Sequence, residues 1–529
     1  MLDLLTLLHL APLALLLQLL ASYWRNPVRR IPAAHPLAPF TSLWMSAVRW
    51  RRIENATLRD AHGRLGPVVC LGPREVSVNC VQGGVRDVYA GGFEKRDARS
   101  GYNWYGFFTN FGLDNMFSTG LNKLHSARKR MLSNIYSKSV VNTSPALQAQ
   151  VSAILYQRLL PRLAALYSGE DKGVFEASSL LNASTMDIVT SYIFGLKASS
   201  NLIDHPDQLA WFLDLYNSRR SYTFWPQEFP QLTSFLKKWL GVSMSPTWVD
   251  GANAEIEKWT RKMCDSAAGV IQQGEAKTED VPSVYQQLSV AVGKEAKKND
   301  MGDADLQSII ASEVLDHLAA GFDTSGITLT YVVHELATHK DIQVQLQQEL
   351  QTLSPRLVAS SSPALPDPKT LDALPVLHAV IWETLRLHSA IPGPQPRFTP
   401  PQGCQLGPNG EYFVPGGVRV SASAGLLHQN ENVYERACEW RPERWLDIHK
   451  MDEEKRKDME SRWFWAFGSG GRMCVGSHLA VYQMKYIFAA LYSNYSTLVV
   501  DDTGIEQSDS YTAPPKGDKL IIRLEELET

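Results

Sequence analysis

Phe467-Gly-Ser-Gly470-Gly-Arg472-Met-Cys474-Val-Gly476, close to the C-terminus, is the stretch that decides the fold. It places one cysteine among four glycines, two residues after an arginine and just before a helix-like run. Glycines let a backbone turn tightly and approach a flat ligand closely, and amide groups at the start of a helix lower the pKa of a thiol. The stretch therefore predicts a thiolate held out to a metal, with Arg472 as a cation for an anionic group. A purely structural turn around a buried cysteine is the alternative.

The composition is that of an ordinary globular chain of 529 residues, with 44% hydrophobic and 20% charged residues. A formal net charge of −3 gives no reason to expect nucleic acid as a partner. The cysteines are scattered and form no Cys-x-x-Cys pair, which favours a reducing compartment and argues against zinc sites and disulfides. They are Cys70, Cys80, Cys264, Cys404, Cys438 and Cys474, and we interpret the first five as ordinary core or surface residues.

The N-terminus predicts a membrane anchor. Residues 1–24 are apolar over about the 20 residues that a helix needs to cross a bilayer. Three arginines follow the apolar run, and by the positive-inside rule they stay in the cytosol. The basic, proline-rich residues 25–40 predict a stiff hinge. No linker interrupts residues 41–529, so we expect one catalytic domain on the cytosolic side.

The periodicity of the remaining chain predicts a mainly α protein with small β-sheets. Residues 65–73 and 75–79 indicate two short strands around a Gly-Pro turn, and residues 145–300 are mostly helical. The C-terminal tail, through 510–515 and 520–524, predicts a last hairpin.

A continuous helical pattern from Asp305 to about His339 predicts a helix roughly 50 Å long. Within it, Asp316, Ala320 and Thr324 recur every four residues and share one face. Small residues on that face leave room for a flat cofactor and a diatomic ligand. A helical threonine can also bond its own upstream carbonyl and open a groove for water or oxygen.

Three further patterns are ambiguous when taken alone. The aromatic density between Arg99 and Phe117 fits a loop packed on the core as well as a pocket wall. A basic run around Arg128 opens a helix and is by default a solvated face. Glu383 and Arg386 lie three residues apart on one helix, which is a common surface arrangement.

The order of these motifs resembles that of the cytochrome P450 family. The resemblance rests on Phe-x-x-Gly-x-Arg-x-Cys-x-Gly at 467–476, Ala320-Gly-x-Asp-Thr324, Glu383-x-x-Arg386 and Trp440-Arg-Pro-Glu-Arg444-Trp445. It implies a cytochrome P450 haem-thiolate fold behind an N-terminal transmembrane helix, of the eukaryotic microsomal type. Cys474 would then be the axial thiolate of haem b, a ligation that favours O–O cleavage.

The resemblance also assigns roles around the haem. Haem contacts are implied for Arg472, Arg397, His125, Lys129, Phe467, Ala320 and Gly321, with Lys129 in a position where the family usually has arginine, so that Arg128 or Arg130 could take that role. Asp323 and Thr324 match the acid and alcohol that relay protons to iron-bound oxygen. Glu383, Arg386 and Arg444 match a buried triad that braces the cysteine loop. The implied substrate pocket comprises Tyr102, Trp104, Phe107, Phe108, Phe117, Ala319, Ile391 and Ala513.

We therefore expect a monooxygenase that oxidises a hydrophobic small molecule, of fungal secondary metabolism by analogy, at the endoplasmic reticulum membrane. The chain has no nicotinamide-binding glycine motif, so electrons must come from a separate protein. The resemblance implies that this is an NADPH-dependent cytochrome P450 reductase, with cytochrome b5 as a further candidate donor. Two alternatives stay open. One is a haem-thiolate enzyme that couples phenols or rearranges its substrate without inserting oxygen, and the other is a haem-free, membrane-tethered binding protein.

Overall fold

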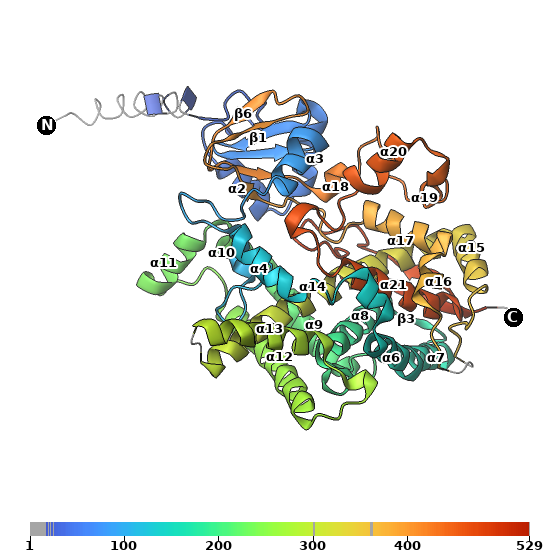
Figure 1. The fold of residues 1–529 in the computed structure, drawn as a ribbon. Coiled ribbons are helices and arrows are strands. Elements are labelled where there is room, and N and C mark those ends of the chain that lie inside the picture. The colour runs from blue at the N-terminus through green and yellow to red at the C-terminus, as the bar shows by residue number, and fades with distance from the viewer. Residues whose placement is uncertain are drawn as a thin grey trace.

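A 36-residue helix, α14 (Asp303–Thr338), runs through the middle of the protein in the computed structural model (Figure 1). It packs along α8 (Ala177–Phe194), which is buried over almost its whole length, as expected of a core helix. Glycine permits the close approach, because a Cβ at Gly321 would lie 2.9 Å from Val189 Cγ2. The long helix predicted from the sequence is thereby confirmed.

The structure describes residues 17–18, 21, 23–24, 26–299, 302–359 and 363–527. The helices that precede α14 are α2 (Leu43–Trp50), α3 (Glu54–Leu65), α4 (Asn122–Leu132), α5 (Lys138–Thr143), α6 (Pro145–Ile154), α7 (Leu160–Ser168), α9 (Pro206–Ser218), α10 (Phe224–Glu228), α11 (Pro230–Leu240), α12 (Thr247–Gln273) and α13 (Ser283–Asn299). Those that follow it are α15 (Lys340–Leu350), α16 (Pro368–Asp372), α17 (Pro375–Leu387), α18 (Ala424–Leu427), α19 (Glu443–Leu446), α20 (Glu453–Lys457) and α21 (Ser477–Tyr492).

Short strands form three small sheets. The largest has the order β1 (Val68–Gly72), β2 (Glu75–Val78), β7 (Arg419–Ser421) and β4 (Arg397–Phe398), with only β2 and β7 parallel. A second has the order β3 (Val174–Glu176), β9 (Ile521–Glu526) and β8 (Tyr495–Asp501), and β5 (Cys404–Leu406) pairs with β6 (Tyr412–Val414). The mainly helical class with small sheets is confirmed.

The C-terminal hairpin differs from its prediction. β9 pairs with β8, whereas residues 510–515 form an irregular turn. Pro514 and Pro515 have no amide hydrogen to give to a ladder, which explains why this segment is not a strand. The backbone amide of Ala513 instead donates to Ala390 O at 2.9 Å, so the turn is fixed against the segment after α17.

The chain that precedes α2 is packed on the largest sheet. Cys70 N donates to Pro32 O at 2.8 Å, and Ala34 N donates to Cys70 O at 3.0 Å. Val28 and Ile31 are buried in the core beneath the sheet. The predicted anchor, residues 1–24, lies almost entirely outside the described residues, and no helix in the described part of the chain is long and apolar enough to span a bilayer.

A buried charge cluster ties α10 to the same sheet. Glu228 accepts from Arg49 Nη1 at 3.1 Å and from Arg419 Nη1 at 2.9 Å, while Glu75 pairs with both arginines. Burial opposes ionisation of Glu228, but the two guanidinium groups lower its pKa to about 2. The indole of Trp104 also donates to Glu228 at 2.9 Å, so the aromatic segment around Trp104 is fixed by this cluster.

Candidate active site

The loop that carries Cys474 is closed by its own backbone. Cys474 N donates to Phe467 O at 2.9 Å, and Met473 N donates to Gly470 O at 3.1 Å. Gly470 has φ +69° and lies against the Tyr89 backbone, where a Cβ would come within 2.8 Å of the carbonyl carbon. Only glycine fits both constraints. The loop therefore needs a glycine at this position to present its cysteine.

The Cys474 side chain is exposed on the open side of the loop, although protein encloses its other sides. Burial raises its pKa, and the backbone amides of Gly476 and Ser477 together with Lys129 only partly oppose this. The sequence-based expectation of a lowered pKa is therefore wrong for the protein alone, because desolvation outweighs the amides at the start of α21. A bound cation such as a metal ion would restore the thiolate.

Helix α4 is hydrogen-bonded to the cysteine loop. Lys129 Nζ donates to Gly471 O at 3.1 Å and to Met473 O at 2.8 Å. Arg472 donates to Asn122 Oδ1 at 2.8 Å and to the carbonyl groups of Thr119 and Gly120. Lys129 thus contacts the backbone of the cysteine loop, and the neighbouring Arg128 pairs with Glu313 at 2.9 Å instead.

Helix α21, which begins just after Cys474, is joined to the central helix. Gln483 Nε2 donates to Ser325 Oγ at 2.7 Å and to Gly321 O at 3.3 Å. The bond falls on the segment of α14 that carries Ala320 and Thr324. The thiol and the predicted oxygen-handling helix therefore belong to one rigid core.

Four basic side chains gather near the loop without matching carboxylates. Arg397, Arg472, His125 and Lys95 influence one another electrostatically, and within the described residues the only ion pair among them is a 3.9 Å contact from Arg472 to Glu94. Burial and the neighbouring cations lower the pKa of His125 to about 3, and that of Arg472 to about 10. An added anion would stabilise the charged forms of these side chains.

Lys95 is the member of this cluster that sequence reasoning missed. The run Glu94-Lys95-Arg96-Asp97 has the composition of a solvated loop, so nothing local marks one lysine as buried. Lys95 is only 4% exposed, its amine donates to Phe117 O at 2.6 Å, and it lies 3.7 Å from the Tyr105 ring centroid. Burial, followed by the charges of Arg397 and Arg472, lowers its pKa well below the ordinary value.

On α14, Ala320 is exposed although the helix around it is largely buried. Ala319 and Gly321 on either side are partly accessible. The hydroxyl of Thr324 donates to Ala320 O at 2.7 Å, which is the helical back-bond expected from the sequence. This face is thus open, lined by small residues and able to admit a flat group.

Asp323 is buried and paired. Its carboxylate accepts from Arg220 Nη2 at 2.7 Å and from Tyr216 OH at 3.4 Å, both from the end of α9 and the turn after it. Arg220 also lies 3.9 Å from Asp518, and the three charged groups line one small cavity. Neither Arg220 nor Tyr216 was identified from the sequence, because only the folded chain brings α9 against α14.

The predicted pocket residues separate into two groups. Trp104, Phe108 and Phe117 pack with Tyr105 and Tyr511 at ring-centroid distances of 5.1 to 6.0 Å, and we name these five rings the aromatic cluster. Tyr105 also accepts from Arg397 Nη1 at 2.8 Å, which connects the cluster to the basic side chains.

The other predicted pocket residues lie outside the cluster. The Tyr102 hydroxyl donates to Gln227 O, and the Phe107 ring is partly exposed and touches Phe108. Ala513 is buried in the turn beside Ala390, while Ile391 is partly buried.

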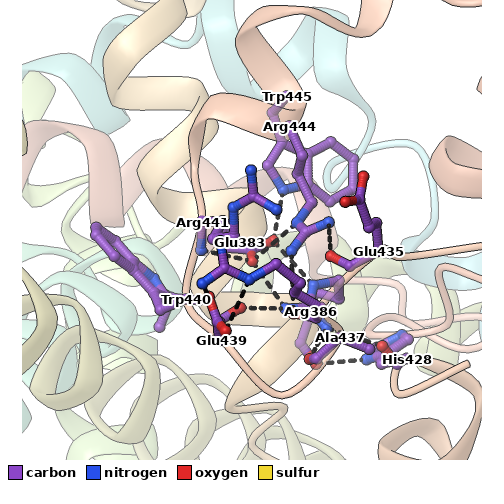
Figure 2. Close-up of polar contacts among 12 residues, drawn as sticks. Glu383, Arg386, His428, Glu435, Ala437, Glu439, Trp440, Arg441, Arg444 and Trp445 are labelled. Atoms are coloured by element: carbon purple, nitrogen blue, oxygen red, sulfur yellow. Dashed lines mark hydrogen bonds and ion pairs between the residues drawn. The ribbon is translucent and has the colours of Figure 1, made fainter. Parts of the chain in front are cut away.

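The Glu383 carboxylate is the centre of a buried network (Figure 2). Arg386 donates to its two oxygens at 2.7 and 2.8 Å, Arg444 Nε donates at 3.0 Å, and Trp445 Nε1 donates at 2.9 Å. Arg386 also donates to the carbonyl groups of His428, Ala437 and Glu439. Glu383 and Arg386 are both 0% exposed, so the three predicted side chains meet in the interior.

His428 extends this network to the cysteine loop. Its backbone carbonyl accepts from Arg386, and its ring Nε2 accepts from Trp465 N at 2.7 Å. Trp465 lies two residues before Phe467, which is the first residue of the loop. The buried charges thus set the position at which the loop begins.

Replacing Glu383 by glutamine should strand the buried Arg386 guanidinium, so we expect the free energy of unfolding to fall by about 3–5 kcal/mol. Urea denaturation followed by circular dichroism measures the loss. Asp60→Asn is the control, because Asp60 and Arg64 form an exposed pair whose removal should cost less than about 1 kcal/mol. Equal losses for the two variants would contradict the role of the buried carboxylate.

Comparison with known proteins identifies the family of this chain. The family model for Cytochrome P450 matches residues 35–522. The chain is 28% identical over 516 residues to cytochrome P450 monooxygenase hkm5 of Aspergillus hancockii, covering 94% of this chain and 90% of the relative. It is 28% identical over 530 residues to cytochrome P450 monooxygenase FGM1 of Gibberella zeae, covering 99% and 97%. It is 27% identical over 524 residues to fusicoccadiene C-8 hydroxylase of Alternaria brassicicola, covering 92% of each. The protein belongs to the cytochrome P450 family.

Proposed function

We propose that this protein is a haem-thiolate monooxygenase that inserts one atom of O2 into a hydrophobic small molecule of fungal secondary metabolism. The observation that carries the proposal is the exposed Cys474 thiol in its glycine loop, joined through α21 to the open Ala320–Thr324 face. The names of the fungal relatives, one of them a hydroxylase, support the same class of reaction. Intact Asp323 and Thr324 favour oxygen chemistry over a rearrangement that needs no protons from the protein.

The residues fit an iron porphyrin. Cys474 would ligate the iron, and Arg397, Arg472, His125 and Lys95 would receive its carboxylates, whose negative charge would favour the protonated forms of His125 and Lys95. When bound, the haem supplies the redox chemistry of O2 activation. The Thr324 hydroxyl can hydrogen-bond on the open face, and Asp323 can hold a proton one residue away. The aromatic cluster excludes water and packs an apolar substrate.

Electrons would come from NADPH through a separate reductase, and Lys123 and Arg130 support this part of the proposal. Both are exposed on α4, the helix whose Lys129 holds the cysteine loop. Cations at this position suit an acidic electron-transfer partner.

The proposed ligation is tested by Cys474→Ala, with the reduced carbon-monoxide difference spectrum as the measurement. We expect the thiolate signature in the wild type and its loss in the variant, because no other side chain replaces the sulfur. Survival of that signature would overturn the assignment. Substrate turnover under labelled O2 then distinguishes the reactions, since a label-free product would indicate coupling or rearrangement rather than insertion.

The proton-supply role of Asp323 predicts a kinetic defect in Asp323→Asn. The amide keeps the shape of the carboxylate but cannot exchange the proton, so we expect turnover to fall about 100-fold and product formed per NADPH to drop. The solvent isotope effect on turnover should change as well. Asp518→Asn is the matched control, because it contacts the same Arg220 at the surface and should keep near wild-type values. An unchanged isotope effect in Asp323→Asn would contradict the role.

We also propose that the protein sits at the endoplasmic reticulum membrane through residues 1–24, with α11 as a second contact. α11 has no buried residue, and its Phe235, Trp239 and Leu240 side chains are exposed. α11 projects from the body beside α10 in Figure 1. Through α10 it adjoins α2, where Leu43 and Trp50 are also exposed. Large exposed apolar side chains gathered in one region favour a lipid surface.

Membrane contact predicts that the amide hydrogens of α11 exchange more slowly in the full chain bound to nanodiscs than in the double variant Phe235→Ser/Trp239→Ser. The apolar side chains bury the helix in lipid, and the serines remove that driving force. Hydrogen–deuterium exchange mass spectrometry measures the difference, with α20 as an internal reference that should not change. Equal exchange of α11 in the two proteins would refute the contact.

A further inference from the structure

Two carboxyl groups lie three residues apart on α14, and they differ in their partners. Glu313 is buried, accepts from Arg128 Nη1 at 2.9 Å and also accepts from Met116 N at 3.0 Å. Asp316 is partly buried, and among the residues that the structure describes it has no basic group within the 4.0 Å of an ion pair. A carboxyl enclosed by protein without a cation is unfavourable in its charged form.

Asp316 lies on the face of α14 that the proposed chemistry uses. It precedes the exposed Ala320 by four residues and Thr324 by eight, so the three residues share one side of the helix. Its side chain is partly accessible, as are those of Ala319 and Thr324. A molecule packed on this face would therefore meet the Asp316 carboxyl.

The neighbours of Asp316 are aromatic. The backbone of Phe117 hydrogen-bonds the carboxyl, and the Phe117 ring belongs to the aromatic cluster. The charge of Asp316 also contributes to the raised pKa of Tyr511, another ring of the cluster. Lys95 is the cation that acts on Asp316 most strongly, but its amine is bonded to Phe117 O and lies over the Tyr105 and Phe117 rings. Lys95 belongs to the group of basic side chains that would bind the carboxylates of the proposed haem.

Burial raises the pKa of Asp316 to about 8, and the charge of Glu313 adds to this effect. Lys95, the Phe117 hydrogen bond and Arg128 act in the opposite direction but do not compensate. The charge of Asp316 also contributes to the raised pKa of two phenols, Tyr136 and Tyr511. The carboxyl is therefore largely protonated at neutral pH in the protein alone, and an incoming cation would favour its ionised form.

We propose that Asp316 selects substrates that carry a cationic nitrogen: its carboxylate pairs with the ammonium group, while the aromatic cluster packs the apolar body and the carbon to be oxidised faces Ala320 and Thr324. Rings beside a carboxylate suit this class of ligand, because a ring face also attracts a cation. The inference rests on the proposed monooxygenase function and narrows its substrate class. The competing explanation is that Asp316 only anchors the loop through the Phe117 backbone.

The test compares two isosteric probes on the purified, haem-loaded full chain. One is the quaternary ammonium ion (2-naphthylethyl)trimethylammonium, and the other is its neutral carbon analogue, (3,3-dimethylbutyl)naphthalene. A quaternary nitrogen has no proton to lose and no lone pair for the iron, so pH affects only the protein. Equilibrium dialysis measures binding without relying on a haem signal, from about pH 6 to about pH 9.

We expect the wild type to prefer the cation by at least about tenfold at the upper end of this range. The preference should weaken as pH falls below the pKa of Asp316, approaching tenfold per pH unit, because the cation must then displace a proton. Asp316→Asn should bind both probes equally at every pH and should bind the neutral probe as the wild type does. Glu313→Gln is the matched control and should keep the preference, since Glu313 is already paired.

Equal binding of the two probes by the wild type would overturn the proposal, as would a preference that survives in Asp316→Asn. If Asp316→Asn does not fold, the wild type decides alone, because a preference that does not depend on pH would also refute the role of this carboxyl. Failure of the monooxygenase assignment has a different signature. The reduced carbon-monoxide spectrum of the wild type would then lack the thiolate band, whatever the probes show.

Discussion

The Glu383 carboxylate, enclosed with the Arg386 and Arg444 guanidinium groups, is the constraint on which the position of the thiol depends. Removing such charges from water is costly, so every donor around them must be in place at once. Arg386 meets this demand by binding three backbone carbonyls, and one of them belongs to His428, which in turn fixes Trp465. This bond fixes the backbone two residues before Phe467, and the hydrogen bond from Cys474 N to Phe467 O then places the cysteine. A cluster outside the proposed catalytic site therefore sets the position of the cysteine loop.

Paired and unpaired charges distinguish the framework from the site. Glu383 and Glu228 each have two arginines and belong to the framework. Arg397 and Lys95 lie in the same interior with no carboxylate at ion-pair distance among the described residues, and Asp316 lacks a cation under the same condition. A folded protein tolerates such groups where a ligand completes them. Arg397 and Lys95 fit the carboxylates of a porphyrin, and Asp316 lies on the side where a substrate would bind.

Local patterns in the sequence were sufficient for a large part of this arrangement. The long helix, the Thr324 back-bond and the proximity of Glu383 to Arg386 all depend on residues three or four positions apart. Other features depend on contacts that no local pattern shows. Tyr511 joins the aromatic cluster, and Arg220 pairs with Asp323, across more than a hundred residues of sequence. Lys95 is buried by an irregular loop that has no regular period. The pKa of Cys474 was mispredicted for a related reason, since helix position is visible in sequence and desolvation is not.

Each of three acidic residues on α14 contacts a different segment that packs over this helix. Glu313 binds Arg128 of α4, Asp316 binds the backbone of Phe117, and Asp323 binds Arg220 after α9. Because α14 packs closely against α8, the three acidic residues have fixed positions along one core helix. A molecule packed between the aromatic cluster and this face of α14 would meet both Asp316 and Thr324. The residues that we propose for substrate recognition and for proton supply thus lie on one helix, about two turns apart.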